Sequence, residues 1–204
     1  MGRKRFVAVV IVLLVLIAVT RVLLTYKLTA QGFDEPGHVA AAIELLDRGT
    51  YALDPLHPPL TRIAIGIPLY LAGERFPNWP ASDPRIHNYH DVGNSVLYDH
   101  GHYLLSLSLA RTAVLPFFVL AVGLVFCWTR QEFGEFAGAM AALLFSTLPV
   151  VLAFSGLAYT DIATGCMQCT ALFAFTRWLE KPTMRSSLVL GVTTGLGSVL
   201  ITAI

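Results

Sequence analysis

Residues 6–20 form an apolar run without a charged side chain, and this run limits the possible folds more than any other feature. As a helix rising ~1.5 Å per residue, the stretch 6–26 can cross a hydrocarbon core about 30 Å thick. Four further apolar runs follow, at approximately 103–129, 136–159, 161–178 and 186–204. The chain is 55% hydrophobic and 13% charged, whereas soluble domains carry roughly 25% charged residues. The sequence therefore predicts an all-α membrane protein, a polytopic helical bundle.

Basic residues in the short connections predict the orientation of this bundle. The connections 129–135 and 177–185 contain Arg or Lys, whereas 155–161 contains neither. Because cytoplasmic loops are enriched in Lys and Arg, we expect a cytoplasmic N-terminus in the cytoplasmic (inner or plasma) membrane. The long loop 27–102 and the connection 155–161 are then extracytoplasmic. A cleaved signal peptide is the alternative for the first run, and it would put the long loop on the same side.

The loop 27–102 holds most of the titratable chemistry, with nine of the thirteen acidic residues and all six histidines. Apolar residues recur at helical spacing over approximately 35–48 and 59–72, which predicts two helices lying along the membrane interface. Asp34 suits the N-cap of the first helix, and Gly49 suits its C-terminal cap.

The last apolar run continues to residue 204 without a closing polar segment. A helix ending there would leave its final carbonyl groups unpaired in lipid. We therefore interpret residues 1–204 as a single transmembrane module, the front part of a longer protein, and expect this part alone to be inactive.

Three acidic residues are candidates for catalysis: Asp34, Glu35 and Asp161. Asp34 and Glu35 precede a helix, so capping explains them, but a carboxylate fixed at a helix start also suits a general base. Asp161 is the only charged residue between Glu135 and Arg177. It either caps a span or marks a functional site. The predicted topology puts all three carboxylates at the extracytoplasmic face, where we expect Asp34 and Asp161 to share one pocket.

Three basic residues are candidates for binding an anion at the membrane surface. His57 and Arg62 belong to the stretch HPPLTR, and Arg111 lies near the outer end of the second apolar run. A stiff turn explains the prolines of the first motif without any histidine, and snorkelling explains Arg111. A phosphate site explains the same three residues through their charge and hydrogen-bond donors.

The sequence leaves open whether the protein binds a divalent metal. The weak candidate ligands are Asp34, Glu35, His87 and His90. The spacing of the loop histidines matches no closed zinc site. A membrane-anchored metal-binding loop is accordingly a minor alternative, and no cofactor follows from the sequence.

Taken in order, the motifs resemble the amino-terminal part of a GT-C superfamily glycosyltransferase. The branch is the one containing protein O-mannosyltransferases and the transferases that modify lipid A and lipopolysaccharide core. The resemblance extends over nearly the whole chain. It rests on the following features: a first span, Asp34-Glu35 in the first outer loop, HPPL at 57–60 between two interfacial helices, Arg111, Phe133-Gly134, Leu148-Pro149 and AYTD at 158–161.

The resemblance implies an inverting hexosyl- or pentosyltransferase that uses a sugar on a polyprenyl phosphate. Asp34 would deprotonate the acceptor hydroxyl, and Asp161 would orient donor or acceptor. His57 and Arg111, with Arg62, would neutralise the donor phosphate. The implied partners are the lipid-linked sugar, membrane lipids and a lipid, glycan or protein acceptor, without nucleic acid. The alternative is a non-catalytic transporter or flippase component for polyprenyl-phosphate lipids, which would not need Asp34 as a base.

Overall fold

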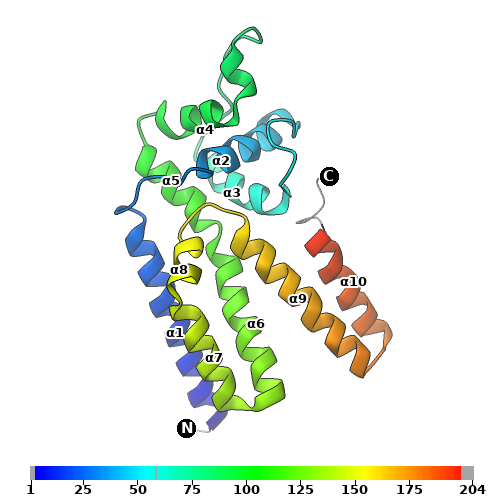
Figure 1. Cartoon of the computed structure of the whole chain (residues 1–204). Coiled ribbons are helices and arrows are strands. Elements are labelled where there is room, and N and C mark those ends of the chain that lie inside the picture. Colours follow the sequence, from blue (N-terminus) through cyan, green and yellow to red (C-terminus); the bar gives the residue numbers. More distant parts are fainter. Residues whose placement is uncertain (1–2, 58, 199–204) are drawn as a thin grey trace.

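The computed structural model describes residues 3–57 and 59–198, and every regular element within these ranges is a helix. This confirms the predicted all-α membrane class. The long helices form a bundle, and a group of short helices covers one end of it (Figure 1). We call this group, residues 35–98, the cap.

The bundle is built from α1 (Arg3–Thr25), α5 (Tyr103–Thr112), α6 (Leu115–Phe133), α7 (Glu135–Thr147) and α8 (Pro149–Ser155). By length and composition, α1 and the joined pair α5–α6 can each cross a membrane, and α7–α8 is a third candidate if it counts as one bent span. The last two helices, α9 (Asp161–Glu180) and α10 (Met184–Ser198), run antiparallel beside the bundle (Figure 1). The division into five spans stays a prediction.

A bend of 63° separates α7 from α8. Pro149 is the first residue of α8, and Leu148 before it has extended backbone angles, φ −60° and ψ 126°. Proline disfavours the helical conformation in the preceding residue, so Leu148 interrupts the helix. The bend sends α8 toward the cap (Figure 1).

The cap begins with α2 (Glu35–Ile43), which continues as a π-helical turn, η1 (Glu44–Arg48), and ends at Gly49. Gly49 has φ +66°, a left-handed conformation that glycine adopts without strain. Next come α3 (Pro59–Leu71), the short 3₁₀-helix η2 (Pro84–His87) and α4 (Tyr89–Tyr98). Helices thus occupy 35–48 and 59–71, close to the expected ranges. Pro58, one of the two prolines of the HPPLTR stretch, lies outside the described residues.

One apolar core holds the cap together and fixes it to the bundle. Its fully buried members come from α2, α3, α4, α5 and the α8–α9 connection, and include Val39, Ile43, Ile65, Leu69, Val92, Leu107, Ala110 and Ala158. The helices α2 and α4 approach so closely that a Cβ at Gly93 would lie 1.9 Å from the Pro36 carbonyl oxygen. The cap therefore has a defined position on the end of α5.

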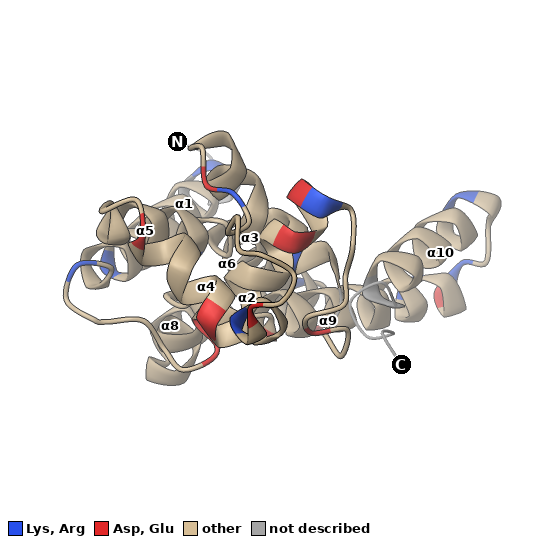
Figure 2. Cartoon of the chain, turned by 90° about the horizontal axis from the view of Figure 1, so that it is seen from above, with Lys and Arg blue, Asp and Glu red and all other residues tan. Residues whose placement is uncertain are grey.

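The connection 156–160, between α8 and α9, lies at the same end of the bundle as the cap (Figure 1). The α6–α7 and α9–α10 connections lie at the other end. In the view from above, the charged residues lie on the cap helices and on the connections between long helices (Figure 2). Segments far apart in sequence, 32–38 and 156–161, are thereby brought to one end of the molecule.

Candidate active site

Glu35 is a completely buried carboxylate that joins three segments of the chain. Its Oε1 accepts hydrogen bonds from Arg111 Nε and the Ala158 backbone N–H, both at 2.8 Å. Its Oε2 accepts from Arg111 Nη2 at 2.8 Å and from the Gly32 backbone N–H at 2.6 Å. Both oxygens are occupied, so Glu35 connects the cap, α5 and the α8–α9 connection.

Arg111 is equally buried and donates every one of its N–H groups within the protein. Besides Glu35, its acceptors are the carbonyl oxygens of Tyr26, Thr29 and Ala30 and the Thr29 hydroxyl. In this structure the guanidinium has no donor left for a ligand. We expected Arg111 at a donor phosphate, but here it balances the buried charge of Glu35.

Asp34, the neighbour of Glu35, is exposed, whereas Glu35 is buried. It occupies the N-cap position of α2, but its side chain makes no capping hydrogen bond, contrary to our expectation. The side chain that binds a backbone N–H just before the helix is instead that of Glu35, which accepts from Gly32. Among the described residues, the Asp34 carboxylate has no hydrogen-bond or ion-pair partner.

Tyr159 contacts Asp34 and lies within electrostatic range of Asp161. The Asp34 backbone N–H donates to Tyr159 Oη at 3.4 Å. Gly32 makes room for the phenol, since a Cβ there would lie 2.5 Å from Oη. Burial raises the pKa of Tyr159, and the charges of Asp34, Glu35 and Asp161 raise it further. All three predicted carboxylates therefore lie within electrostatic range of one phenol.

Asp161 begins α9, is exposed, and lines one end of an apolar cavity of about 200 Å³. The other walls come from α6, α7, α8 and α9: Ala121, Leu124, Val125, Phe145, Val151, Ile162, Gly165, Cys166 and Cys169. A carboxylate at the end of such a cavity suits a ligand that has a polar head and an apolar tail.

Arg62 is the second fully buried arginine. It donates from Nη2 to Asp54 Oδ2 at 2.6 Å and from Nη1 to Tyr51 Oη at 2.9 Å and to the Asp54 carbonyl oxygen. Its Nε donates to His38 Nδ1 at 3.3 Å, and Nη2 lies 3.2 Å from the same nitrogen. Arg62 therefore does not reach an external phosphate directly in this structure.

His57 remains accessible, with 45% of its side chain exposed. Its Nδ1 lies 3.2 Å from Asp54 Oδ2, and its carbonyl oxygen accepts a hydrogen bond from Tyr51 Oη at 2.6 Å. With Nδ1 held by Asp54, the other ring nitrogen is left for a ligand. Of the three predicted phosphate-binding residues, His57 is the one whose side chain the structure leaves exposed.

His38, which sequence reasoning did not select for a role, lies between the two ends of the candidate site. Its ring packs edge-on against His57, with centroids 5.1 Å apart, and against Tyr159, with centroids 5.7 Å apart. Burial, then the charges of Arg62 and His57, lower the pKa of His38 to about 3. The imidazole is therefore neutral at physiological pH. Its spacing of four residues from Asp34, about one helical turn, was the available signal.

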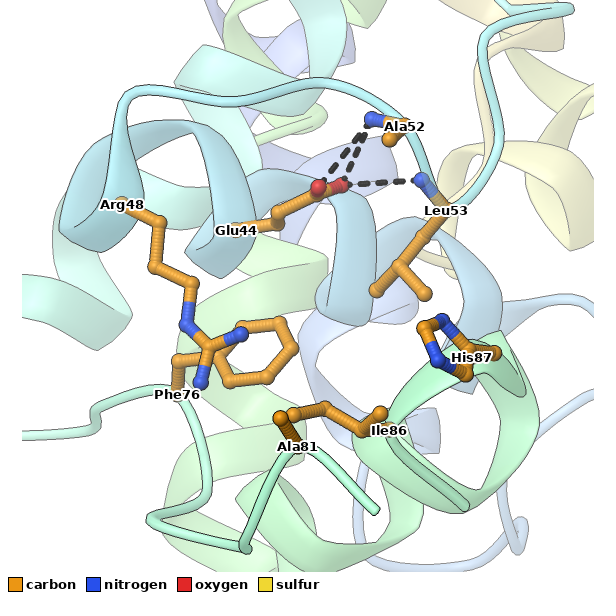
Figure 3. A pocket seen from close by; sticks show the side chains of 8 residues that line it. All are labelled: Glu44, Arg48, Ala52, Leu53, Phe76, Ala81, Ile86 and His87. Carbon is orange, nitrogen blue, oxygen red and sulfur yellow. Dashed lines mark hydrogen bonds between the residues drawn. The ribbon is translucent and has the colours of Figure 1, made fainter. Parts of the chain in front are cut away.

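Glu44 holds the loop that supports Asp54 and His57. Its carboxylate accepts hydrogen bonds from the backbone N–H groups of Ala52 and Leu53 (Figure 3). It also accepts one from the Thr50 hydroxyl. Beyond this loop lies a cavity of about 480 Å³ that Arg48 and His87 also line (Figure 3). The buried carboxylate thus gives an otherwise irregular loop a fixed course.

The weak metal candidates do not form a coordination site. Glu35 is occupied by Arg111, His87 lines the cavity beyond the loop, and His90 stacks on Phe33 and Tyr89. Within residues 3–57 and 59–198, no group of three or more His, Cys, Asp or Glu side chains is arranged to hold a metal ion.

Comparison with known proteins supports the resemblance. Residues 106–200 match the family model described as dolichyl-phosphate-mannose-protein mannosyltransferase. No curated protein and no solved structure gives a match. The matched range includes Arg111 and Asp161 but begins after the other candidate residues. Over these residues the chain is similar to that family, which agrees with the resemblance of its motifs to GT-C superfamily glycosyltransferases.

Proposed function

We propose that the protein transfers a sugar from a polyprenyl-phosphate donor to an acceptor hydroxyl, with Asp34 as the general base. The reaction takes place at the outer face of the cytoplasmic membrane. The observation that carries this proposal is the contact of Asp34 with Tyr159, because it joins the DE motif of the cap to the AYTD motif of the family-matched segment.

The proposed step needs a base and a leaving-group site on opposite sides of the sugar. Asp34 takes the proton of the acceptor hydroxyl, whose oxygen bonds to the anomeric carbon as the bond to the phosphate oxygen breaks. The products are the glycosylated acceptor, with inverted configuration, and the free polyprenyl phosphate. His57 stabilises the charge that develops on the leaving phosphate. Asp161 orients the acceptor or the sugar.

Three features support these assignments. Asp34 is exposed and unpaired among the described residues, as a base must be, whereas Glu35 is not. His57 is exposed and held by Asp54. The apolar cavity beside Asp161 offers a surface for an isoprenoid tail. Glu35, Arg62 and Arg111 then fix the geometry without touching the substrate.

The test is Asp34→Asn in the full chain purified in detergent, with undecaprenyl-phosphate-linked hexoses and pentoses offered as donors. We expect sugar transfer to fall about 10²- to 10⁴-fold, the range for loss of a general base, while binding of undecaprenyl phosphate persists. Asp91→Asn, the same change on α4 of the cap, is the matched control and should leave transfer unchanged.

Two outcomes contradict the proposal. If Asp34→Asn transfers sugar at the wild-type rate, Asp34 is not the base. If the wild-type protein moves undecaprenyl phosphate between leaflets of a vesicle and transfers no sugar, the transporter alternative holds instead.

A further inference from the structure

The positive charge of Arg62 is buried, so no ligand contacts it directly. His38 is the neighbouring group through which that charge can act on a ligand. The guanidinium is fully buried and directs N–H groups at Asp54, Tyr51 and His38. Asp54 and Tyr51 are themselves occupied by these bonds. His38 is the partner whose second polar atom remains to be accounted for.

The hydrogen bonds fix the tautomer of His38. Its Nδ1 accepts from Arg62 Nε at 3.3 Å and lies 3.2 Å from Arg62 Nη2. Arginine only donates, so Nδ1 carries no proton, and in the neutral ring the proton must lie on Nε2. His38 therefore presents an N–H donor on the side of the ring away from Arg62.

The Nε2–H of His38 has no acceptor among the residues that the structure describes. The residue as a whole is only 4% exposed, so this donor lies in a largely buried ring. It is left for a ligand that reaches the edge of the ring away from Arg62.

The location of the ring suits a ligand phosphate. His38 contacts His57, the exposed residue assigned to the leaving phosphate, and Tyr159, which contacts the base Asp34. We propose that His38 is a phosphate-binding residue: its Nε2–H donates to a phosphate oxygen of the polyprenyl-phosphate donor, and Arg62 acts on that phosphate only through His38. This inference rests on the proposed function.

The arrangement explains why a buried arginine accompanies the histidine motif. A hydrogen bond received at Nδ1 withdraws electron density from the ring, which makes Nε2–H a stronger donor. The ring is also held neutral by its surroundings, so the donor stays in one tautomer across the physiological range. Asp54 fixes Arg62 and His57 together, which aligns both histidines on one ligand.

The test uses two substitutions that each keep one ring nitrogen. In His38→Asn the amide oxygen replaces the Nδ1 acceptor for Arg62, and the Nε2–H donor is lost. In His38→Gln the amide nitrogen replaces the Nε2–H donor, and the acceptor for Arg62 is lost. Binding of undecaprenyl phosphate to the full chain in detergent is measured for both, with undecaprenol as the probe that lacks phosphate. His102→Asn, at an exposed histidine without a side-chain partner among the described residues, is the control.

We expect His38→Asn to lose about tenfold or more in affinity for undecaprenyl phosphate, the value of one hydrogen bond to a charged group. His38→Gln should stay within about threefold of the wild type, while its melting temperature falls because Arg62 loses an acceptor. Affinity for undecaprenol should not change in any variant.

The inference is overturned if affinity follows stability instead, so that His38→Asn binds like the wild type and His38→Gln binds weakly. His38 would then only support Arg62. A wild-type protein that binds undecaprenol as well as undecaprenyl phosphate overturns the proposed function, and this inference with it. A phosphate preference that keeps its wild-type size in His38→Asn overturns this inference alone.

Discussion

The buried anchor around Glu35 and the exposed face around Asp34 begin at adjacent residues and behave in opposite ways. Glu35 has four hydrogen bonds and no exposed surface, whereas the Asp34 side chain has no partner among the described residues. Successive residues at a helix start point in directions about 100° apart, so one faces the core and the other faces outward. The comparison shows that one carboxylate of the pair is held inside the fold, while the other has no partner among the described residues.

The two arginines extend the same contrast. Arg62 and Arg111 are both completely buried, and each is paired with a carboxylate, Asp54 and Glu35 respectively. A buried pair contributes little net stability, but removing one partner leaves an uncompensated charge. These pairs therefore fix geometry, and the side chains of His57, Asp34 and Asp161 next to them remain exposed.

The largest expected effect comes from Glu35→Gln, which leaves Arg111 charged and unbalanced. We expect a loss of about 3–5 kcal/mol in stability, measured as a lower melting temperature and a lower yield of folded protein in detergent. Glu132→Gln, at an exposed glutamate on α6, is the control and should change neither. A Glu35→Gln protein that melts like the wild type would remove the distinction between anchor and active face.

A smaller effect is expected from pH, through His38. Burial and the neighbouring charges of Arg62 and His57 lower the pKa of His38 to about 3 from 6.5, with Asp54 acting in the opposite direction. Between these values the unfolded chain binds a proton that the folded chain does not, so stability is full above pH 6.5 and decreases below it.

The change amounts to at most about 2 kcal/mol between pH 6.5 and pH 5. Melting temperatures measured over pH 7.5 to 5 should fall more steeply in the wild type than in His38→Asn. Equal slopes in the two proteins would mean that His38 does not titrate differently in the folded state.

The smallest expected effect is that of Asp34→Asn on stability. Because the Asp34 side chain makes no capping hydrogen bond, its replacement should change stability by less than about 0.5 kcal/mol. The measurement is again the melting temperature, set beside that of Glu35→Gln. A large drop in the Asp34 variant would show that this residue is also part of the anchor.

Sequence patterns predict much of this fold because the signals are local. The apolar runs and the spacing of Val39 and Ile43 predict helices, and Gly49 ends one of them in the left-handed conformation that favours glycine. The division of α7 and α8 follows from Pro149. The π-helical turn at 44–48 has no comparable signal, because it depends on how Glu44 reaches the loop at 50–53.

The candidate site was harder to predict because its decisive contacts join distant segments. The predicted topology puts Asp34 and Asp161 at one face, but it does not predict Tyr159 as the residue that both carboxylates influence. The contrast between Asp34 and Glu35 depends on Arg111 and Ala158, more than 70 positions away. For the same reason, the burial of Arg62 and its contact with His38 could not be predicted from the HPPL motif.

The 63° break before Pro149 has a consequence for the contacts of Tyr159. Had α7 continued straight into α8, the α8–α9 connection would take another course, and Tyr159 would lose its contacts with Gly32 and Asp34. A proline inside an apolar segment thereby decides which residues, more than 100 positions earlier in the chain, this phenol meets.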